Sequence, residues 1–460
     1  MSAVGAWRRW ALLALPPLLA LPAIWLLLSV SLLASDDGLN HVNRQVSFDE
    51  LLRQGVLFPR LYPDLASGYG YPLGSFYPPL SLYVAEAPLL FGGDPPAGVR
   101  LSLALALLVA AAGAFGLGRA LSGRIAGGVL AGAAYLFAPY LLAVVYVRGA
   151  MAEAWALAIL PWVFWSLLNW RGAWRGAVWP ALALAALLLA HNLIALFGWP
   201  LAALWWVVLR RGAGWQTLFR GALPFALALG LTAFYWLPAL VEAGAVSLNR
   251  FSGKPLDGLI GLDRLVDIGP VFGGAGFRLG LVQVMAAGAG LATALALRRL
   301  RAPALFGAAA MLTVAVGISV VAAPFWGLGL LDAVQFPFRL LGPAALLGAV
   351  ASTPLALLRT GSVVAAAIGA SCWERADWPG CRLPARGRPG ALHTGGRRPL
   401  GVCRPLGRDD HIAGIPAGRG SVALAGRWVC YTTRYPRRPG VSRSATVAVW
   451  AIRYRSCAAR

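Results

Sequence analysis

The stretch "WALLALPPLLALPAIWLLLSVSLLASDD", residues 10–37, decides the fold class of this chain. Its first 25 residues contain no charged side chain, and the stretch ends at two adjacent acids, Asp36 and Asp37. A helix of that length crosses the roughly 30 Å of hydrocarbon in a bilayer. The apolar core of a secretory signal peptide is shorter, so we expect a retained signal-anchor helix here.

The composition of the whole chain also indicates a membrane protein. Of its 460 residues, 59% are hydrophobic and only 12% are charged, whereas soluble domains carry about 25% charged residues. Long apolar runs recur without the alternation of barrel strands, and only helices or closed barrels satisfy their backbone groups in lipid. We therefore expect an all-α polytopic membrane protein with about 10–11 transmembrane helices. The expected spans are 10–34, 101–118, 125–147, 154–170, 177–190, 193–209, 221–241, 279–297, 303–323 and 340–358, with another beginning near residue 361.

The distribution of charge predicts which side of the membrane each connection faces. Short connections after every second span are basic, and all thirteen acids before residue 371 fall in the other connections. The positive-inside rule therefore places the N-terminus in the cytoplasm and two long loops, 35–100 and 242–278, outside. Residues 77–92 are apolar but short and proline-rich, and counting them as a span would move every later basic loop outside. We expect this segment to lie in the membrane interface. The basic residues that this scheme places on the cytoplasmic side are Arg8, Arg9, Arg119, Arg124, Arg171, Arg175, Arg210, Arg211, Arg298, Arg299, Arg301 and Arg359.

The composition changes abruptly near residue 370. Residues 371–460 contain 17 arginines, four acids and all five cysteines, and the expected helix from residue 361 stops too early to span. We therefore divide the chain into a membrane domain, 1–370, and an Arg-rich tail of low order, 371–460. A shifted reading frame near Ala370 explains this break, and a genuine basic disordered tail is the alternative. The net charge of +23 does not indicate a nucleic-acid partner, because no basic motif is interleaved with stacking aromatics.

The first outer loop contains the leading candidates for chemistry. Asp36 and Asp37 either cap a short helix over residues 38–45 or serve a function, and adjacent carboxylates repel each other unless something holds them together. His41 lies one turn after Asp37, so both side chains are candidates for contact with one substrate hydroxyl or one metal ion. Ser47 to Glu50 has a capping-box pattern, which predicts a second short helix.

Four further residues are candidates for the site. Glu153 follows Arg148 by five residues, so the two form either a structural ion pair or contacts with substrate. Arg339, in "QFPFRLL", is either a snorkelling side chain or a phosphate ligand, since Arg binds phosphate through two parallel hydrogen bonds. His191 lies between two short apolar runs, and a packing role is the more common one for such a residue.

Five segments of the sequence resemble a known family. "DDGLNHVNR", "GVLFPRLYPDLASGYGYPLGSFYPPL", "YVRGAMAEAWA", "LPALVEAG" and "QFPFRLL" are similar to the bacterial membrane domain labelled 6-pyruvoyl-tetrahydropterin-synthase-related, over about residues 7–365. An acidic pair at the exit of the first helix also resembles the GT-C superfamily of membrane glycosyltransferases. The label carries no pterin chemistry here, because the chain lacks that enzyme's three-histidine zinc site.

The resemblance implies a GT-C-like fold and a sugar donor linked to polyprenyl phosphate. It implies that Asp36 or Asp37 is the general base, and that His41, Arg148, Glu153 and Arg339 contact substrate or phosphate. Some members of the superfamily use a divalent metal, for which Asp37 and His41 are the candidates, and others use none. The expected location is the bacterial cytoplasmic (inner) membrane, in cell-envelope assembly. The alternatives are a transporter or flippase for a lipid-linked substrate, although no internal repeat favours it, and a non-catalytic envelope assembly protein.

Overall fold

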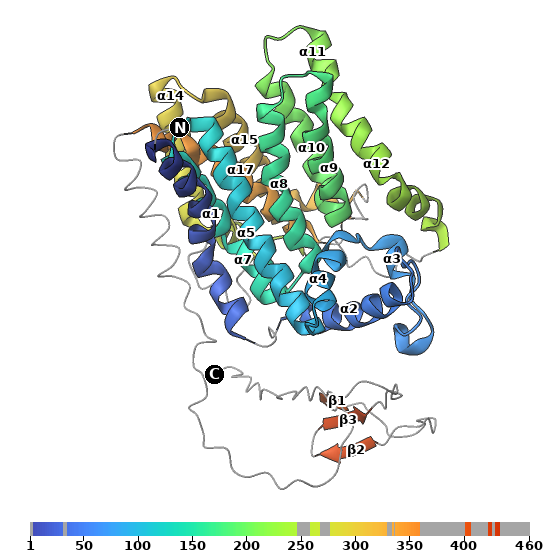
Figure 1. Ribbon diagram of the computed structural model, residues 1–460. Coiled ribbons are helices and arrows are strands. Elements are labelled where there is room, and N and C mark those ends of the chain that lie inside the picture. The colour runs from blue at the N-terminus through green and yellow to red at the C-terminus, as the bar shows by residue number, and fades with distance from the viewer. Residues whose placement is uncertain are drawn as a thin grey trace, which may run out of the picture. The chain divides into compact units, whose positions relative to one another are not determined.

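The computed structural model describes residues 3–30, 35–245, 258–266, 277–328, 334 and 336–358, together with three strands between residues 401 and 432. Two compact units divide the chain, Met1–Cys381 and Arg382–Arg460. The described part of the first unit is a bundle of helices (Figure 1). The predicted helix from residue 361 lies outside the described residues.

The helices of the first unit follow one another with short connections. They are α1 (Ala3–Ser29), α2 (Gly38–Arg53), η1 (Ala66–Gly68), α3 (Leu73–Phe76), α4 (Leu80–Leu90), α5 (Pro95–Ser122), α6 (Ile125–Leu136), α7 (Pro139–Ala143), η2 (Val144–Arg148), α8 (Met151–Asn169), η3 (Trp174–Ala177), α9 (Val178–Ala190), α10 (Asn192–Leu209), α11 (Trp215–Arg220), α12 (Ala222–Val241), η4 (Ala243–Ala245), α13 (Leu262–Leu265), α14 (Leu281–Leu297), α15 (Arg301–Gly317), η7 (Val320–Ala322), α16 (Ala323–Trp326), η8 (Pro337–Leu340), α17 (Leu341–Ser352) and η9 (Thr353–Leu357).

The predicted positions of the spanning helices agree with the helices of the bundle. Each of the ten ranges coincides with a helix or with consecutive helices in continuous sequence. By length and composition, five of the described helices can cross a membrane, or six if the pair Ile125–Leu136 and Pro139–Arg148, bent by 51°, is one span. The other predicted spans correspond to apolar helices of 10–17 residues: Ala14–Ser29, Trp174–Ala190, Leu281–Leu297 and Arg301–Gly317. The chain is therefore a multi-pass helical membrane protein, and most of its described spans are as long as the predicted ranges or longer.

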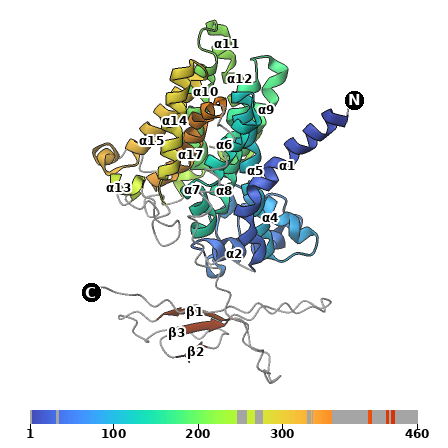
Figure 2. The ribbon, with the colours of Figure 1, turned by 90° about the vertical axis from the view of Figure 1, so that its left-hand side faces the viewer.

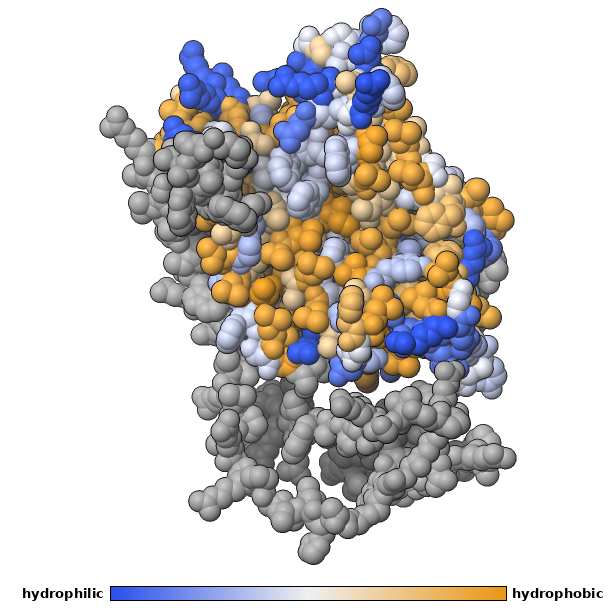
Figure 3. Space-filling model, in the orientation of Figure 1, coloured by the Kyte–Doolittle hydropathy of each residue, from blue (hydrophilic) through white to orange (hydrophobic). Residues whose placement is uncertain are grey.

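The small helices of the first loop lie together at one end of the bundle. In Figure 1, α2, α3 and α4 gather at the lower end, while α11 and the N-terminus lie at the upper end; Figure 2 shows the same division from the side. A broad hydrophobic surface covers the middle of the bundle, with hydrophilic residues towards both ends (Figure 3). We call the end that carries α2–α4 the loop end. The segment 77–92 contains the short apolar helix α4, and its position in the membrane interface stays a prediction.

Helix α5 shows how the sequence positions a span. The Asp94 carboxylate accepts a hydrogen bond from the Ala97 amide at 2.7 Å, with proline at the first helical position, which satisfies amides that the helix leaves free. A Cβ atom at Gly118 would lie 2.3 Å from the carbonyl oxygen of Gly127 on α6. Glycine at this point therefore permits the close backbone approach that stabilises helix pairs in membranes.

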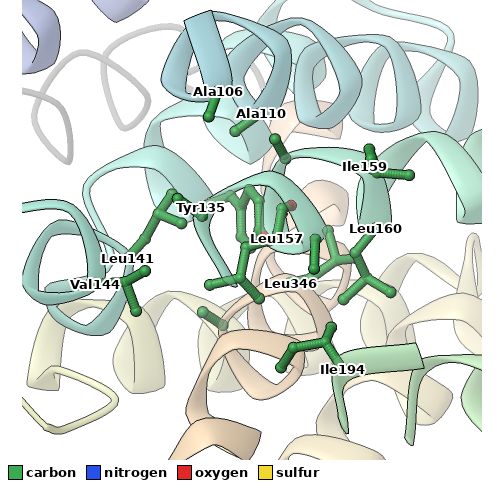
Figure 4. Close-up of a cluster of buried hydrophobic side chains, with 14 of the residues drawn as sticks. Ala106, Ala110, Tyr135, Leu141, Val144, Leu157, Ile159, Leu160, Ile194 and Leu346 are labelled. Carbon is green, nitrogen blue, oxygen red and sulfur yellow. Dashed lines mark hydrogen bonds between the residues drawn. The ribbon is translucent and has the colours of Figure 1, made fainter. Parts of the chain in front are cut away.

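The bundle core joins the helices that carry the candidate site. Figure 4 shows Tyr135 of α6 beside Leu157 of α8, with Ile194 of α10 and Leu346 of α17 in the same cluster. All four side chains are buried. The Tyr135 hydroxyl donates to the carbonyl oxygen of Leu157 at 2.7 Å. Because interiors are close-packed, these contacts fix α6, α8, α10 and α17 relative to one another.

The first loop differs from the prediction in one respect. Residues 38–53 form the single helix α2, so the capping-box pattern at Ser47 does not begin a second helix. Ser47 is buried within α2, because its place on the face packed against the bundle outweighs the local capping signal. Asp37 is the N-cap residue, but its carboxylate makes no capping hydrogen bond.

The second unit contains one small antiparallel sheet. Its strands are β1 (Gly401–Pro405), β2 (Val422–Ala425) and β3 (Trp428–Thr432), in the order β1-β3-β2. In the register of the sheet, Cys403 of β1 lies opposite Cys430 of β3. The segment 361–400, where we predict the shift of reading frame, lies outside the described residues.

Candidate functional site

The two adjacent acids are bonded to the end of η2. The amide of Asp36 donates to the carbonyl oxygen of Val147 at 3.0 Å, and the amide of Asp37 donates to that of Arg148 at 2.8 Å. These two bonds join segments more than 100 residues apart in sequence. The start of α2 is therefore fixed to the backbone of Arg148, and both aspartates lie at the loop end.

Glycine at position 149 makes this approach possible. Gly149 has φ +63, and a Cβ atom there would lie 2.3 Å from Oγ of Ser35. Residues other than glycine rarely adopt this backbone conformation. Any larger residue would therefore strain the turn after Arg148 and push the two aspartates away from it.

The two aspartates have different surroundings. Asp36 is exposed, whereas Asp37 is half-buried. Asp37 interacts electrostatically with Arg148 and with Tyr77 of the first loop. Since its carboxylate makes no capping bond, it is the better placed of the two to accept a proton from a substrate.

A buried cluster of charged side chains lies beside the aspartates. Glu153, in the first turn of α8, is 1% exposed, and its Oε2 lies 2.6 Å from Nη1 of Arg148 and 3.6 Å from Nε of Arg339. The Tyr140 hydroxyl donates to the other carboxylate oxygen of Glu153. The predicted pairing of Arg148 with Glu153 is therefore present, and Arg339 joins it from η8. We call these four residues the Glu153 cluster.

Positive charge exceeds negative charge in the Glu153 cluster. Two guanidinium groups share one carboxylate, and their side chains are only 10% and 16% exposed. Nε of Arg339 is buried without a hydrogen-bond partner among the described residues. Phe338 lies 5.6 Å from the Arg148 guanidinium, and Phe336 lies 5.3 Å from that of Arg339. Aromatic faces attract the cations electrostatically, but the unpaired Nε of Arg339 still favours an anion.

His41 is buried between α2 and α8. The side chain is 2% exposed, and its Nε2 accepts a hydrogen bond from the Met151 amide at 3.4 Å. Burial, with a smaller contribution from Arg44, lowers the pKa of His41 to about 3. The imidazole is therefore neutral, and its proton is on Nδ1. In this position His41 joins the helix of Asp37 to the helix of Glu153.

Arg44 is a cation on the face of α2 that also carries Asp37. It lies seven residues after Asp37, two helical turns on, and its guanidinium stands 5.0 Å from the centre of the Tyr77 ring. In the part of the chain that the structure describes, no carboxylate lies within ion-pair distance of it. The sequence analysis did not single out Arg44 or Tyr77.

A buried hydrogen bond joins α2 to α4. Gln45 is fully buried and donates to Oε2 of Glu86 at 2.6 Å. Burial, with a smaller contribution from the neighbouring Asp49, raises the pKa of Glu86 to about 7. Asp49 also pairs with Arg53 at 2.6 Å. The hydrogen bond from Gln45 to Glu86 therefore helps to hold the helix that carries Asp37 against α4.

The break between α9 and α10 brings His191 near the Glu153 cluster. Nδ1 of His191 accepts a hydrogen bond from the Ile194 amide at 3.3 Å and so caps α10. The imidazole interacts electrostatically with Glu153, Arg339 and Arg148. Sequence position alone favoured a packing role for His191, because nothing local reveals this long-range neighbourhood.

An apolar cavity of about 870 Å³ lies beside the same break. The first loop and α4 form one side of it, with Leu57 and Tyr83 among the residues there. Leu189 at the end of α9 and Phe234 of α12 line the other side. Leu189 precedes His191 by two residues, so the cavity adjoins the segment that faces the Glu153 cluster.

A divalent metal does not fit the candidate ligands. Nowhere in the described ranges do three His, Cys, Asp or Glu side chains gather as a metal site would require. His41, one of the two candidates, uses Nε2 to accept from an amide, so its other nitrogen carries the proton and offers no lone pair.

Comparison with known proteins supports the predicted family. Residues 75–256 match the family described as "6-pyruvoyl-tetrahydropterin synthase related domain; membrane protein". This range includes Arg148, Glu153 and His191 and confirms the resemblance over the central part of the chain. It is shorter than the predicted range of about 7–365. No curated protein sequence matches the chain.

The fold is similar to that of two solved structures. Both are single-particle cryo-EM structures of the arabinofuranosyltransferase AftD from Mycobacteria. The first has a TM-score of 0.51 and 20% identity, covering 80% of this chain and 26% of that one. The second, of a mutant, has a TM-score of 0.49 and 18% identity, covering 80% and 27%. The chain therefore has a GT-C-like fold and spans about a quarter of the length of the proteins it resembles.

The structure brings most of the predicted site residues together. Asp37, Arg148, Glu153 and Arg339 converge at the loop end, and Asp36 lies exposed beside them. His41 adjoins them as a buried link between helices rather than as an exposed ligand. Tyr140, which was not predicted from the sequence, lies in "APYLLAVVYVRG" eight residues before Arg148, so about two helical turns separate them; that spacing was the available signal.

Proposed function

We propose that this chain is a membrane glycosyltransferase. In this proposal it transfers a sugar from a polyprenyl-phosphate donor to a hydroxyl group of an acceptor, with Asp37 as the general base. The observation that carries the proposal is the position of Asp37, fixed to the backbone of an arginine whose buried cluster has more cationic than anionic groups. A transfer of this kind needs a base and a cation close together.

The proposed reaction is a direct displacement at the anomeric carbon. The acceptor oxygen forms a bond to that carbon, and its proton passes to the carboxylate of Asp37. The bond from the carbon to the phosphate oxygen breaks, and polyprenyl phosphate leaves with the electron pair. The anomeric centre is inverted. A correctly positioned base contributes roughly 10²–10⁴-fold to such a rate.

The arginines of the Glu153 cluster are proposed to hold the departing phosphate. Arg339 has a buried donor without a partner within the described residues, and it shares Glu153 with Arg148. Pre-positioned cations in a site with little water stabilise developing negative charge strongly. Glu153 keeps the two guanidinium groups close together despite their mutual repulsion.

The donor lipid is proposed to occupy the apolar cavity with part of its chain. The cavity of about 870 Å³ adjoins the break that carries His191, so an apolar chain and an anionic head would have neighbouring sites. We further propose that the loop end faces the outside of the bacterial cytoplasmic membrane, with the N-terminus inside. Labelling of single cysteines placed at residues 69 and 211, in a chain without its native cysteines, tests this orientation.

Genetic complementation tests the proposed function. We would delete the gene, restore it as wild type, Asp37→Asn or Asp36→Asn, and analyse envelope lipids and glycans by mass spectrometry. The wild type should restore one glycan product, and Asp37→Asn should leave its unglycosylated acceptor to accumulate. Asp36→Asn is the matched control, because Asp36 is exposed and its loss should reduce the product less.

A transporter predicts a different result in the same experiment. Loss of a carboxylate that binds no reacting group should leave glycan structure intact and change only the side of the membrane on which a lipid-linked sugar accumulates. Full restoration by Asp37→Asn would remove this residue from the role of base.

A further inference from the structure

His191 carries a neutral hydrogen-bond donor and lies near the Glu153 cluster. Its Nδ1 accepts from the Ile194 amide at 3.3 Å, and a ring nitrogen that accepts carries no proton. The proton of the imidazole must therefore be on Nε2. The side chain is partly buried, and Nε2 has no hydrogen-bond partner among the residues that the structure describes.

The tautomer of His191 is set by the fold rather than by the charged residues. α9 ends at Ala190 and α10 begins at Asn192, so His191 is the single residue between the two helices. As the N-cap it satisfies a free amide of α10 through one nitrogen. Its other nitrogen is left available on the side of the ring away from that bond.

The neighbours of His191 favour an anion. The ring interacts electrostatically with Arg148, Arg339 and Glu153. A protonated imidazole would repel the two guanidinium groups, whereas a neutral N–H adds a donor without adding charge. Nε of Arg339 is also buried without a partner in the described ranges, so two unused donors belong to the same neighbourhood.

We infer that His191 donates from Nε2 to the oxyanion held by Arg148 and Arg339. This inference rests on the proposed function and adds a third, uncharged ligand for a phosphate group. The phosphate would then meet three hydrogen-bond donors held in fixed positions, and not only an opposite charge. It orients the phosphate through the rigid N-terminus of α10, which the bundle core fixes to α8 and α17.

Binding of farnesyl phosphate to the purified full chain in detergent tests the inference. The matched variants separate the two nitrogens. In His191→Asn the short amide keeps the N-cap, because Asn is among the best capping residues, but this side chain does not reach the cluster. In His191→Gln the longer amide retains a donor near the position of Nε2 but caps poorly. Arg339→Gln is the control for the phosphate position itself.

The inference predicts opposite behaviour for the two histidine variants. His191→Asn should bind farnesyl phosphate about tenfold or more weakly, as expected for loss of a hydrogen bond to a charged group, and should unfold near the wild-type temperature. His191→Gln should bind within about threefold of wild type but unfold at a lower temperature. A purely structural role predicts instead that affinity follows stability in both variants.

Two further outcomes separate this inference from the proposed function. If His191→Asn binds like wild type while Arg339→Gln loses binding, the inference is wrong and the phosphate position stands. If Arg339→Gln also binds like wild type, the phosphate position itself is wrong. Inorganic phosphate is the second probe: equal weakening for both probes supports contact with the oxyanion. Weakening for farnesyl phosphate alone overturns the inference, because the loss then concerns the chain.

Discussion

Replacing Glu153 by Gln should destabilise the protein through its two arginines. The substitution keeps the size of the side chain but removes the one carboxylate of the Glu153 cluster. Arg148 and Arg339, with side chains 10% and 16% exposed, then face each other without a counter-charge. Breaking a buried ion pair by removing one partner costs about 3–5 kcal/mol. At about 2 °C for each kcal/mol in a chain of this size, the unfolding temperature should fall by about 6–10 °C.

Thermal unfolding in detergent, followed by tryptophan fluorescence, measures this effect directly, since the chain contains 19 tryptophans. Tyr140→Phe is the matched control, because it removes one hydrogen bond to the same carboxylate and leaves its charge. That loss should cost about 1.5–3 kcal/mol. Farnesyl phosphate should raise the unfolding temperature of Glu153→Gln more than that of Tyr140→Phe, since its oxyanion replaces the missing charge. An unfolding temperature of Glu153→Gln within about 2 °C of wild type would refute the reasoning on the cluster.

Three other predictions concern the loop end and the tail. Glu86 has a pKa raised to about 7 from 4.5, so between these values the folded chain keeps a proton that the unfolded chain releases. The stability of the fold should therefore fall as pH rises from 4.5 to 7 and stay level above it. Glu86→Gln should flatten this dependence in thermal unfolding measured across that range, and an unchanged slope would contradict the assignment. Gly149→Ala should lower the unfolding temperature and weaken farnesyl phosphate binding, because its Cβ would lie 2.3 Å from Oγ of Ser35 at φ +63. Gly230→Ala, at an open position inside a helix, is the control and should lower neither, because alanine favours a helix over glycine. Sequencing of the gene across codons 360–380 should show a shifted reading frame, and an intact frame there would support a genuine basic tail.

Much of the fold could be predicted from the sequence because the membrane imposes it locally. A span must be apolar over its whole length, so runs such as 101–118 and 154–170 identified α5 and α8 without any knowledge of their neighbours. The prediction failed where local signals compete with packing. Ser47 has the pattern of a helix start, yet it is buried inside α2.

The candidate site was predictable only in part, for a related reason. Arg148 and Glu153 are five residues apart, so their pairing could be anticipated from the sequence. Arg339 reaches the same carboxylate from η8, and His41 bonds to an amide 110 residues away. Contacts of this kind leave no mark on either segment alone. The role of His191 likewise depends on where the break between α9 and α10 lies in the bundle.

The most direct test of the central claim is to identify the lipid that copurifies with the protein. If Asp37 is the base beside a bound phosphate, Asp37→Asn can bind the donor but cannot transfer its sugar. Native mass spectrometry should then find a sugar linked to polyprenyl phosphate on Asp37→Asn, and polyprenyl phosphate without the sugar on the wild type. The same bound lipid on both proteins, or no bound lipid phosphate on either, would contradict the account.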